Sequence, residues 1–238
     1  MSRLYAVGVG PGDPELLTRK AERILRQVDV ICTPTGAAEA ASYALNIVEP
    51  FLDRERQQVL VQTFPMSKDE AVLRPHWEAA VAQIVTEIEA GREVAFITIG
   101  DPFLYSTFLY LWRILRQNHP QIEIEIVPGI TSVGAAAAVA GLPLGLAADR
   151  IAILPATYAV DELRRTLADF ETVVLMKVSR VFDQIYPLLA ELGLAQSSVF
   201  VRRVGSSDEE VVHDLATLVG QKLDYLSLLI IHKGGWDG

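Results

Sequence analysis

The sequence predicts an α/β protein, because short apolar, strand-like runs alternate with helix-like segments along the chain. Three of the apolar runs end in turns rich in glycine and proline: Gly8-Val9-Gly10-Pro11-Gly12-Asp13, Gly100-Asp101-Pro102 and Pro128-Gly129-Ile130-Thr131-Ser132. Glycine lets the backbone approach a ligand closely, because it has no Cβ and tolerates positive φ. Ligands of open α/β sheets bind beyond the carboxyl ends of the strands. The three turns therefore predict one cleft with a wall made mostly of backbone.

The first half of the chain reads as four strands and four helices. Apolar runs predict strands at 4–9, 28–32, 59–64 and 93–99. Asp13 is placed to cap the first helix with Pro14 at its first position, where the missing N–H costs nothing. Apolar residues at helical spacing support that helix and a long one over 75–90, and further helices are expected at 37–47 and 107–117.

The segment Asn118-His119-Pro120 breaks the last of these helices and predicts a domain boundary, giving domains of residues 1–119 and 120–238. The second domain is expected to begin with a strand over 122–127. Its alternating Ile and Glu residues predict one solvated face and a partly antiparallel second sheet. An alanine-rich helix follows. Further strands are expected at 151–154, 172–176, 198–203 and 226–232, with helices at 160–167 and 181–192.

Composition limits the classes of function. The chain has 238 residues, half of them apolar, and a net charge of −9. Such an acidic balance argues against nucleic acid as a partner, which needs a basic surface. The apolar run at 133–148 is too short and too rich in small residues to span a membrane. No secretion signal is visible, so we expect a cytoplasmic protein without a membrane partner.

The side chains that commonly bind metals are few and scattered. Cys32 is the only cysteine, and its apolar flanks predict a buried, inert thiol. The histidines show no spacing typical of zinc ligands: His76, His119, His213 and His232. We therefore expect no metal site.

The first turn matches the dinucleotide-binding fingerprint only in part. Gly8 and Gly10 fit, but Asp13 occupies the third glycine position and Pro11 lies within the turn. The chain also lacks the Gly-Lys-Ser/Thr of a phosphate loop, so NAD, FAD and ATP are disfavoured. No Ser–His–Asp or Cys–His arrangement follows from residue positions, and the sequence identifies no catalytic residue.

The same turns carry a resemblance. The segment 8–18, together with Gly100-Asp101-Pro102 and the turn at 128–132, resembles the signature turns of the tetrapyrrole methyltransferases of corrin and sirohaem biosynthesis. The resemblance covers essentially the whole chain. Within that family, the segments 100–108, 153–157, 173–178 and 225–230 are most similar to the branch that methylates ring carbon 20 of precorrin-2 or cobalt-factor II.

The resemblance implies two α/β domains with S-adenosylmethionine (SAM) in a cleft between them, and a homodimer. It does not imply the single-sheet, Rossmann-like methyltransferase fold. SAM has no phosphate, so backbone groups in glycine turns can match its adenine edge, ribose hydroxyls and amino-acid tail. The cofactor contacts of the family correspond here to Pro11, Gly100, Asp101, Leu104, Ser106, Thr107, Thr131, Ser132, Met176, Val204 and Ser227.

The implied acceptor is a ring that carries many carboxylates, which the net charge of −9 would repel. Local cations must therefore offset that repulsion, and arginine suits bidentate contacts with carboxylates. The candidate substrate-binding residues are Tyr105, Lys177, Arg180, Arg202 and Arg203. Ordinary solvated charges are the alternative interpretation of the basic residues. Phe103, Leu104, Tyr105 and Met176 are apolar residues that could line the cleft.

Two other functions remain open at this point. The first is methylation of a different acceptor by a member of the same family: another precorrin carbon, uroporphyrinogen III, ribosomal RNA, or the translation-factor residue that becomes diphthamide. The acidic net charge argues against ribosomal RNA as the acceptor. The second is a module that binds SAM or a tetrapyrrole without catalysis. Labelled SAM offered with a panel of acceptors separates these functions.

Overall fold

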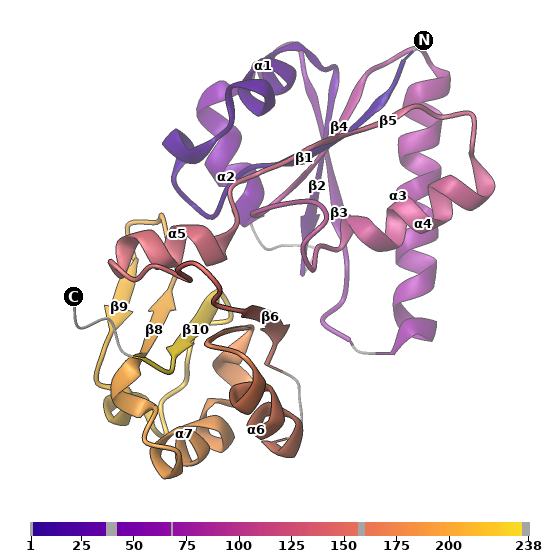
Figure 1. Cartoon of the computed structure of the whole chain (residues 1–238). Helices are drawn as coiled ribbons and strands as arrows, with labels where there is room; N and C mark the ends of the chain where they lie inside the picture. The colour runs from indigo at the N-terminus through magenta and orange to yellow at the C-terminus, as the bar shows by residue number, and fades with distance from the viewer. Residues whose placement is uncertain (1, 37–41, 68, 157–159, 235–238) are drawn as a thin grey trace. The chain divides into compact units, whose positions relative to one another are not determined.

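The computed structural model describes residues 2–36, 42–67, 69–156 and 160–234. It divides into two compact units, Met1–Thr131 and Ser132–Gly238. Each unit contains a five-stranded sheet with helices packed on it (Figure 1). The predicted α/β class with two domains is therefore confirmed.

The first unit has an entirely parallel sheet with the strand order β3-β2-β4-β1-β5. Its strands are β1 (Leu4–Gly8), β2 (Val30–Thr35), β3 (Gln58–Thr63), β4 (Val94–Thr98) and β5 (Ile124–Val127). In the register of the three strands at one side, Val7 of β1 lies opposite Ile97 of β4 and Val127 of β5. The carboxyl ends of β4, β1 and β5 therefore lie at one edge, and each leads into one of the three glycine turns.

Helices cover both faces of this sheet (Figure 1). The long α3 (Glu70–Glu89) and α4 (Phe108–Asn118) pack on one face, where Phe96 and Phe108 are fully buried. The opposite face packs against α1 (Arg19–Gln27) and α2 (Tyr43–Val48), through residues such as Ile24 and Ile97. Both cores form because β-strand residues alternate between the two faces.

The starts of two helices differ from the sequence prediction. Asp13 caps only the short 3-10 helix η1 (Pro14–Leu16), and α1 begins later, where the Thr18 side chain accepts a hydrogen bond from the Ala21 N–H at 3.1 Å. Leu17 therefore precedes the helix. Helix α3 begins before Pro75, because Asp69 caps it at 2.9 Å through the Ala71 N–H. Of the helix expected at 37–47, residues 37–41 lie outside the described part, Ser42 caps α2, and residues 43–47 lie within α2.

The second unit has a mixed sheet with the order β6-β7-β10-β8-β9. Its strands are β6 (Ile151–Pro155), β7 (Thr172–Met176), β8 (Ser198–Arg202), β9 (Glu210–Val212) and β10 (Ser227–His232). Strands β6 and β7 are parallel, whereas β10 is antiparallel to both β7 and β8. The short β9 extends the sheet beside β8, to which it is antiparallel.

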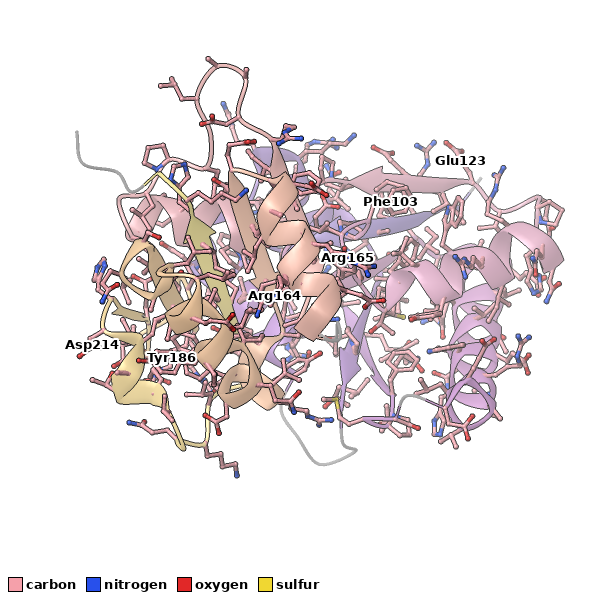
Figure 2. The ribbon with its side chains drawn as sticks, turned by 60° about the horizontal axis from the view of Figure 1, so that its bottom comes forward. Phe103, Glu123, Arg164, Arg165, Tyr186 and Asp214 are labelled. Atoms are coloured by element: carbon pink, nitrogen blue, oxygen red, sulfur yellow. The ribbon has the colours of Figure 1, made fainter. Side chains whose placement is uncertain are left out.

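Helices also pack on this second sheet (Figure 1). Helices α6 (Val160–Asp169) and α7 (Phe182–Glu191) share a core with the sheet around the buried Phe182 and Phe200. The two helices are also joined by an ion pair of 2.7 Å between Arg164 and Glu191, and Figure 2 shows Arg164 on α6. Helix α5 (Ser132–Val139) is the alanine-rich helix, and it contacts β10.

The predicted domain boundary and one strand assignment need correction. The division falls between Thr131 and Ser132 rather than between 119 and 120, because β5 pairs with β1 in the first sheet. The Ile/Glu alternation of 122–127 therefore does not mark an antiparallel strand of a second sheet. Its glutamates instead contact cations on neighbouring elements, with Glu125 at 3.2 Å from Arg3 and 2.6 Å from Lys20. The second sheet is nevertheless partly antiparallel.

Cys32 is fully buried in the first core, and burial raises the pKa of its thiol to about 12, as expected for an inert thiol. Within the described ranges, no group of three or more His, Cys, Asp or Glu side chains is placed to hold a metal ion. In the same part of the chain, none of the helices combines the length and the apolar character needed to cross a bilayer.

Candidate functional site

The three glycine turns of the first unit meet at the carboxyl edge of its sheet. The N–H of Gly100 donates to the carbonyl of Gly10 at 2.7 Å, and the two residues form an isolated antiparallel bridge. The Val9 N–H donates to the Thr98 carbonyl at 2.9 Å just before this bridge. The turn after β1 is thus bonded through its main chain to the turn after β4.

Two glycines in these turns are required by backbone packing. A Cβ added to Gly8 would lie 2.5 Å from the Gly100 carbonyl oxygen and 2.6 Å from the Gly129 nitrogen. A Cβ added to Gly129 would overlap the same carbonyl oxygen and would lie 2.8 Å from Gly8 atoms. Such distances are far inside van der Waals contact, so Gly8, Gly100 and Gly129 touch through backbone atoms alone.

Gly100 differs from the other two glycines. Its φ is +68°, which disfavours any other L-residue, yet a Cβ there would meet nothing closer than Ile130 and Thr131 atoms at 4.0 Å. The side of Gly100 that faces Ile130 and Thr131 therefore leaves room that a side chain would take up. A backbone wall with such room fits SAM, whose polar edges can bond to main-chain groups.

Hydrogen bonds of the Asp101 and Ser106 side chains fix the turn after β4. One oxygen of Asp101 accepts from the Phe103 N–H at 2.8 Å, and the other accepts from the Gly129 N–H at 3.0 Å. The buried Ser106 hydroxyl lies 3.0 Å from the Thr98 hydroxyl and accepts from the Phe108 N–H at 3.1 Å. Ser106 thereby fixes the entry to α4.

The remaining first-unit candidates lie in the same three turns. Pro11 is buried directly after Gly10, and Thr131 ends the turn after β5. Leu104 is half-buried, and its N–H lies 3.4 Å from the Asp101 carbonyl oxygen. Thr107 directly precedes α4, and its hydroxyl does not cap that helix. The structure thus brings Pro11, Gly100, Asp101, Leu104, Ser106, Thr107 and Thr131 to one edge of the first sheet.

The candidates of the second unit gather mainly at one end of its sheet. Met176 ends β7 and Ser227 begins β10, and the Lys177 N–H donates to the Ser227 carbonyl at 3.1 Å. Val204 follows β8 and is buried, next to Arg203, whose N–H donates to the Leu226 carbonyl at 2.8 Å. Ser132 is the first residue of α5.

Lys177 and Arg180 follow β7 directly. Lys177 has left-handed backbone angles, φ 59° and ψ 40°, and burial lowers the pKa of its ammonium group. Arg180 is exposed and ends the 3-10 helix η3 (Val178–Arg180). Burial raises the pKa of the Tyr225 hydroxyl, and the positive charge of Arg180 opposes that rise. Two cations and one phenol thus surround the end of β7.

Arg202 and Arg203 line a surface pocket together with three acidic side chains, Asp208, Glu209 and Glu210. Arg202 pairs with Glu210 at 2.5 Å, and Arg203 pairs with Asp224 at 2.7 Å. Burial alone would raise the pKa of Asp224, but hydrogen bonds from the Leu226 N–H and Arg203 bring it below its usual value. The positive charge of both arginines is therefore largely offset within the chain.

Left-handed backbone conformations occur at three of the five substrate-binding candidates. In the described part of the chain, the residues other than glycine with positive φ are Tyr105, Ala147, Lys177 and Arg203. All of these except Ala147 are candidates named from the sequence. For bulky residues this conformation is strained, and such strain is concentrated at functional sites.

Sequence reasoning missed the partners that hold the site in place. Thr98, which bonds Ser106, and Gly129, which bonds Asp101, were not among the candidate residues. The position of Gly129 in a Pro-Gly turn signalled a close backbone approach, but no local pattern identified Asp101 as its partner. No sequence signal distinguishes Thr98 from any other threonine in a buried strand.

Comparison with known proteins gives consistent matches. A sequence profile described as Tetrapyrrole (Corrin/Porphyrin) Methylases matches residues 3–219. The chain is 36% identical over 232 residues to a cobalt-precorrin-2 C(20)-methyltransferase of Salmonella typhimurium, covering 97% of this chain and 96% of that protein. It is 33% identical to a precorrin-2 C(20)-methyltransferase of Sinorhizobium sp, covering 99% and 96%.

A solved structure agrees with these sequence matches. The X-ray structure of a cobalt precorrin-4 methyltransferase, described as a cobalamin biosynthetic enzyme, superposes with a TM-score of 0.75 at 25% identity. The superposition covers 98% of this chain and 95% of that one.

Proposed function

The chain belongs to the tetrapyrrole (corrin/porphyrin) methylase family, and on that premise we propose that it transfers a methyl group from SAM to ring carbon 20 of precorrin-2 or cobalt-factor II in cobalamin biosynthesis. The observation that carries this function is similarity over nearly the whole length to relatives that share this one ring position, with and without cobalt. The enzyme is a SAM-dependent C-methyltransferase.

SAM supplies a methyl group that its sulfonium sulfur already activates. The protein must therefore mainly align the ring carbon with that methyl group, which is catalysis by proximity and orientation. In the first unit, the backbone wall at Gly100 and the turn residues Pro11, Asp101, Leu104, Ser106, Thr107 and Thr131 are proposed to hold SAM. In the second unit we assign the same role to Ser132, Met176, Val204 and Ser227.

We propose Lys177, Arg180 and Tyr105 as the principal contacts of the acidic ring. Lys177 and Arg180 follow a strand end directly, and Lys177 and Tyr105 adopt strained backbone angles. Arg202 and Arg203 remain candidates, but each must exchange an acidic partner within the chain for a substrate carboxylate.

The acceptor is tested by incubating the protein with methyl-labelled SAM and either metal-free precorrin-2 or cobalt-factor II, and locating the label by NMR. A single labelled methyl group at carbon 20 is expected, with a preference for one of the two rings. A label at carbon 2, 7 or 17 would preserve the family and the methyl donor but would replace the acceptor. Uroporphyrinogen III and ribosomal RNA complete the panel.

The role of Lys177 is tested by replacing it with glycine, which accepts left-handed angles. Relief of about 1–2 kcal/mol of strain offsets the greater freedom of glycine in the unfolded chain, so we expect stability within about 1 kcal/mol of wild type. The KM for the tetrapyrrole should rise about tenfold, because a hydrogen bond to a charged group contributes about 1.5 kcal/mol or more. Binding of SAM should be unchanged.

Ala147→Gly is the matched control, because Ala147 also has a positive φ, of 50°, in the loop between α5 and β6. It should relieve strain without changing the KM for the tetrapyrrole. An unchanged KM in Lys177→Gly would remove Lys177 from the substrate site.

We also propose that the protein is a cytoplasmic homodimer. This assignment rests on resemblance to the family. Size-exclusion chromatography with light scattering measures the mass in solution, and a single 26.1 kDa species at micromolar concentration would contradict the dimer.

A further inference from the structure

The carboxylate of Asp101 joins two turns that are far apart in the sequence. Its Oδ1 accepts from the Phe103 N–H at 2.8 Å, within its own turn. Its Oδ2 accepts from the Gly129 N–H at 3.0 Å, from a residue 28 positions along the chain. Each oxygen is therefore engaged by a main-chain donor of the protein.

These bonds hold the last segment of the first unit. Gly129 lies in the turn between β5 and Thr131, and its backbone touches the Gly100 carbonyl. The atoms nearest to the open side of Gly100 belong to Ile130 and Thr131, at 4.0 Å. The width of the space beside Gly100 is therefore set by where the turn at 128–131 lies, and the carboxylate of Asp101 bonds to that turn directly.

We propose that Asp101 is a positioning residue for the methyl donor: it holds the turn at 128–131 at a fixed distance from Gly100 and so sets the shape of the SAM-binding wall. This proposal rests on the proposed function, because Gly100 and Thr131 are among the contacts assigned to SAM. In this role the Asp101 side chain binds backbone N–H groups of the protein rather than the ligand. A carboxylate suits that role, because its hydrogen bonds to N–H groups are charge-assisted and short.

Asp101→Asn is the first test. A carboxamide has one acceptor oxygen, and its NH2 group would face one of the two N–H donors, so one of the two bonds is lost. Isothermal calorimetry should show about tenfold weaker binding of both SAM and S-adenosylhomocysteine. The KM for the tetrapyrrole should remain within about twofold of wild type.

Asp101→Ser separates the bond within the turn from the bond between turns. A serine hydroxyl can still accept from the Phe103 N–H two residues later, as in an ST-turn, but it is too short to reach Gly129. Affinity for S-adenosylhomocysteine should fall in this variant as in Asp101→Asn. Wild-type affinity in Asp101→Ser would show that the bond to Gly129 has no role in binding.

The matched control is Asp183→Asn. The Asp183 carboxylate also accepts from a distant glycine, the Gly220 N–H, at 3.0 Å and 37 positions away, but this pair lies in the second unit and neither residue is a candidate site residue. Thermal melting should show similar losses for Asp183→Asn and Asp101→Asn, whereas only the latter weakens binding. Equal binding in the two variants, or failure of both Asp101 variants to fold, would overturn the proposal by making Asp101 merely structural.

Two comparisons separate the remaining explanations. SAM carries one more positive charge than S-adenosylhomocysteine, so a purely electrostatic role of Asp101 would weaken SAM binding more than binding of the product, and that result would contradict positioning. If wild type binds neither compound, the proposed function itself fails. If wild type binds both and Asp101→Ser binds equally well, only the positioning role fails.

Discussion

Glycine is required at positions 8 and 129 for a different reason than at position 100. The first two have carbonyl and amide atoms of neighbouring turns where a side chain would begin. Gly100 instead combines a φ of +68° with room around its Cα. The same residue type therefore serves packing at two positions and, in the proposed site, a ligand-facing wall at the third.

Alanine substitutions should separate these roles. Gly129→Ala forces backbone atoms apart and is expected to cost about 3 kcal/mol of unfolding free energy, the upper part of the usual range for overpacking. Gly100→Ala should cost about 1–2 kcal/mol from its left-handed conformation and should also weaken SAM binding, because the new methyl group enters the space beside Thr131. Denaturant unfolding and calorimetry on each variant measure the two effects.

Gly141→Ala provides the control for Gly100→Ala. Gly141 has a φ of +64° and no atom within 4 Å of an added Cβ, and it lies outside the candidate site. Its substitution should cost similar stability with no change in SAM affinity. If the two variants bind SAM equally well, the room beside Gly100 does not belong to the binding site.

Among the elements, the parallel pair β6–β7 is held at its start by an ion pair. The Arg150 guanidinium donates to both oxygens of Glu171 at 3.1 and 3.2 Å, and the Arg150 N–H donates at 2.8 Å. The hydrogen bonds from the Arg150 side chain and backbone lower the pKa of Glu171 to about 2. The charged carboxylate therefore stabilises the folded state.

This stabilisation should depend on pH. Because the pKa of Glu171 is lower in the folded protein than in the unfolded chain, where it is about 4.3, its contribution is present above pH 4.3 and is lost as the pH falls toward 2. The melting temperature of wild type should exceed that of Glu171→Gln at pH 7, and the difference should shrink between pH 5 and pH 3. A difference that stays constant over this range would contradict the assignment.

The sequence located strands better than helix starts, for physical reasons. Strands buried on both faces are continuous apolar runs, so β4 and β7 could be predicted directly. Pro75 resembled a helix start, but capping by Asp69 stabilises an earlier one and tolerates the proline inside the helix. Strand β9, with 3 residues, is too short to show a period. The glycine turns of the candidate site could be predicted from the properties of glycine and from family resemblance. The Asp101–Gly129 bond could not, because it depends on which strands become neighbours in the sheet.

For the whole molecule, the division between the units follows strand pairing rather than the helix break at Pro120. Strand β5 completes the first sheet beside β1, and it brings Glu125 to Arg3 and Lys20. Without β5, β1 would become an unpaired edge. An exposed edge of this kind promotes aggregation.

Two fragments test this division. Residues 1–131 retain every strand of the first sheet and should melt cooperatively as a soluble fragment. Residues 1–119 lack β5 and the buried Val127, and they should melt at a lower temperature or aggregate. Circular dichroism melting and light scattering of the two fragments provide the measurement. Equal stability would indicate that β5 contributes little to the first unit.

The proposed cofactor wall, which is built from main chain, has a consequence for protein engineering. Replacing a large side chain of a binding site with a smaller one is one way to make room for an enlarged SAM analogue. Glycines such as Gly100 leave nothing to trim, and Gly8 and Gly129 fix the backbone behind it. On this proposal, selectivity for an enlarged analogue must be engineered at contacts with side chains, and the proposed SAM contacts Leu104 and Met176 are the first to vary.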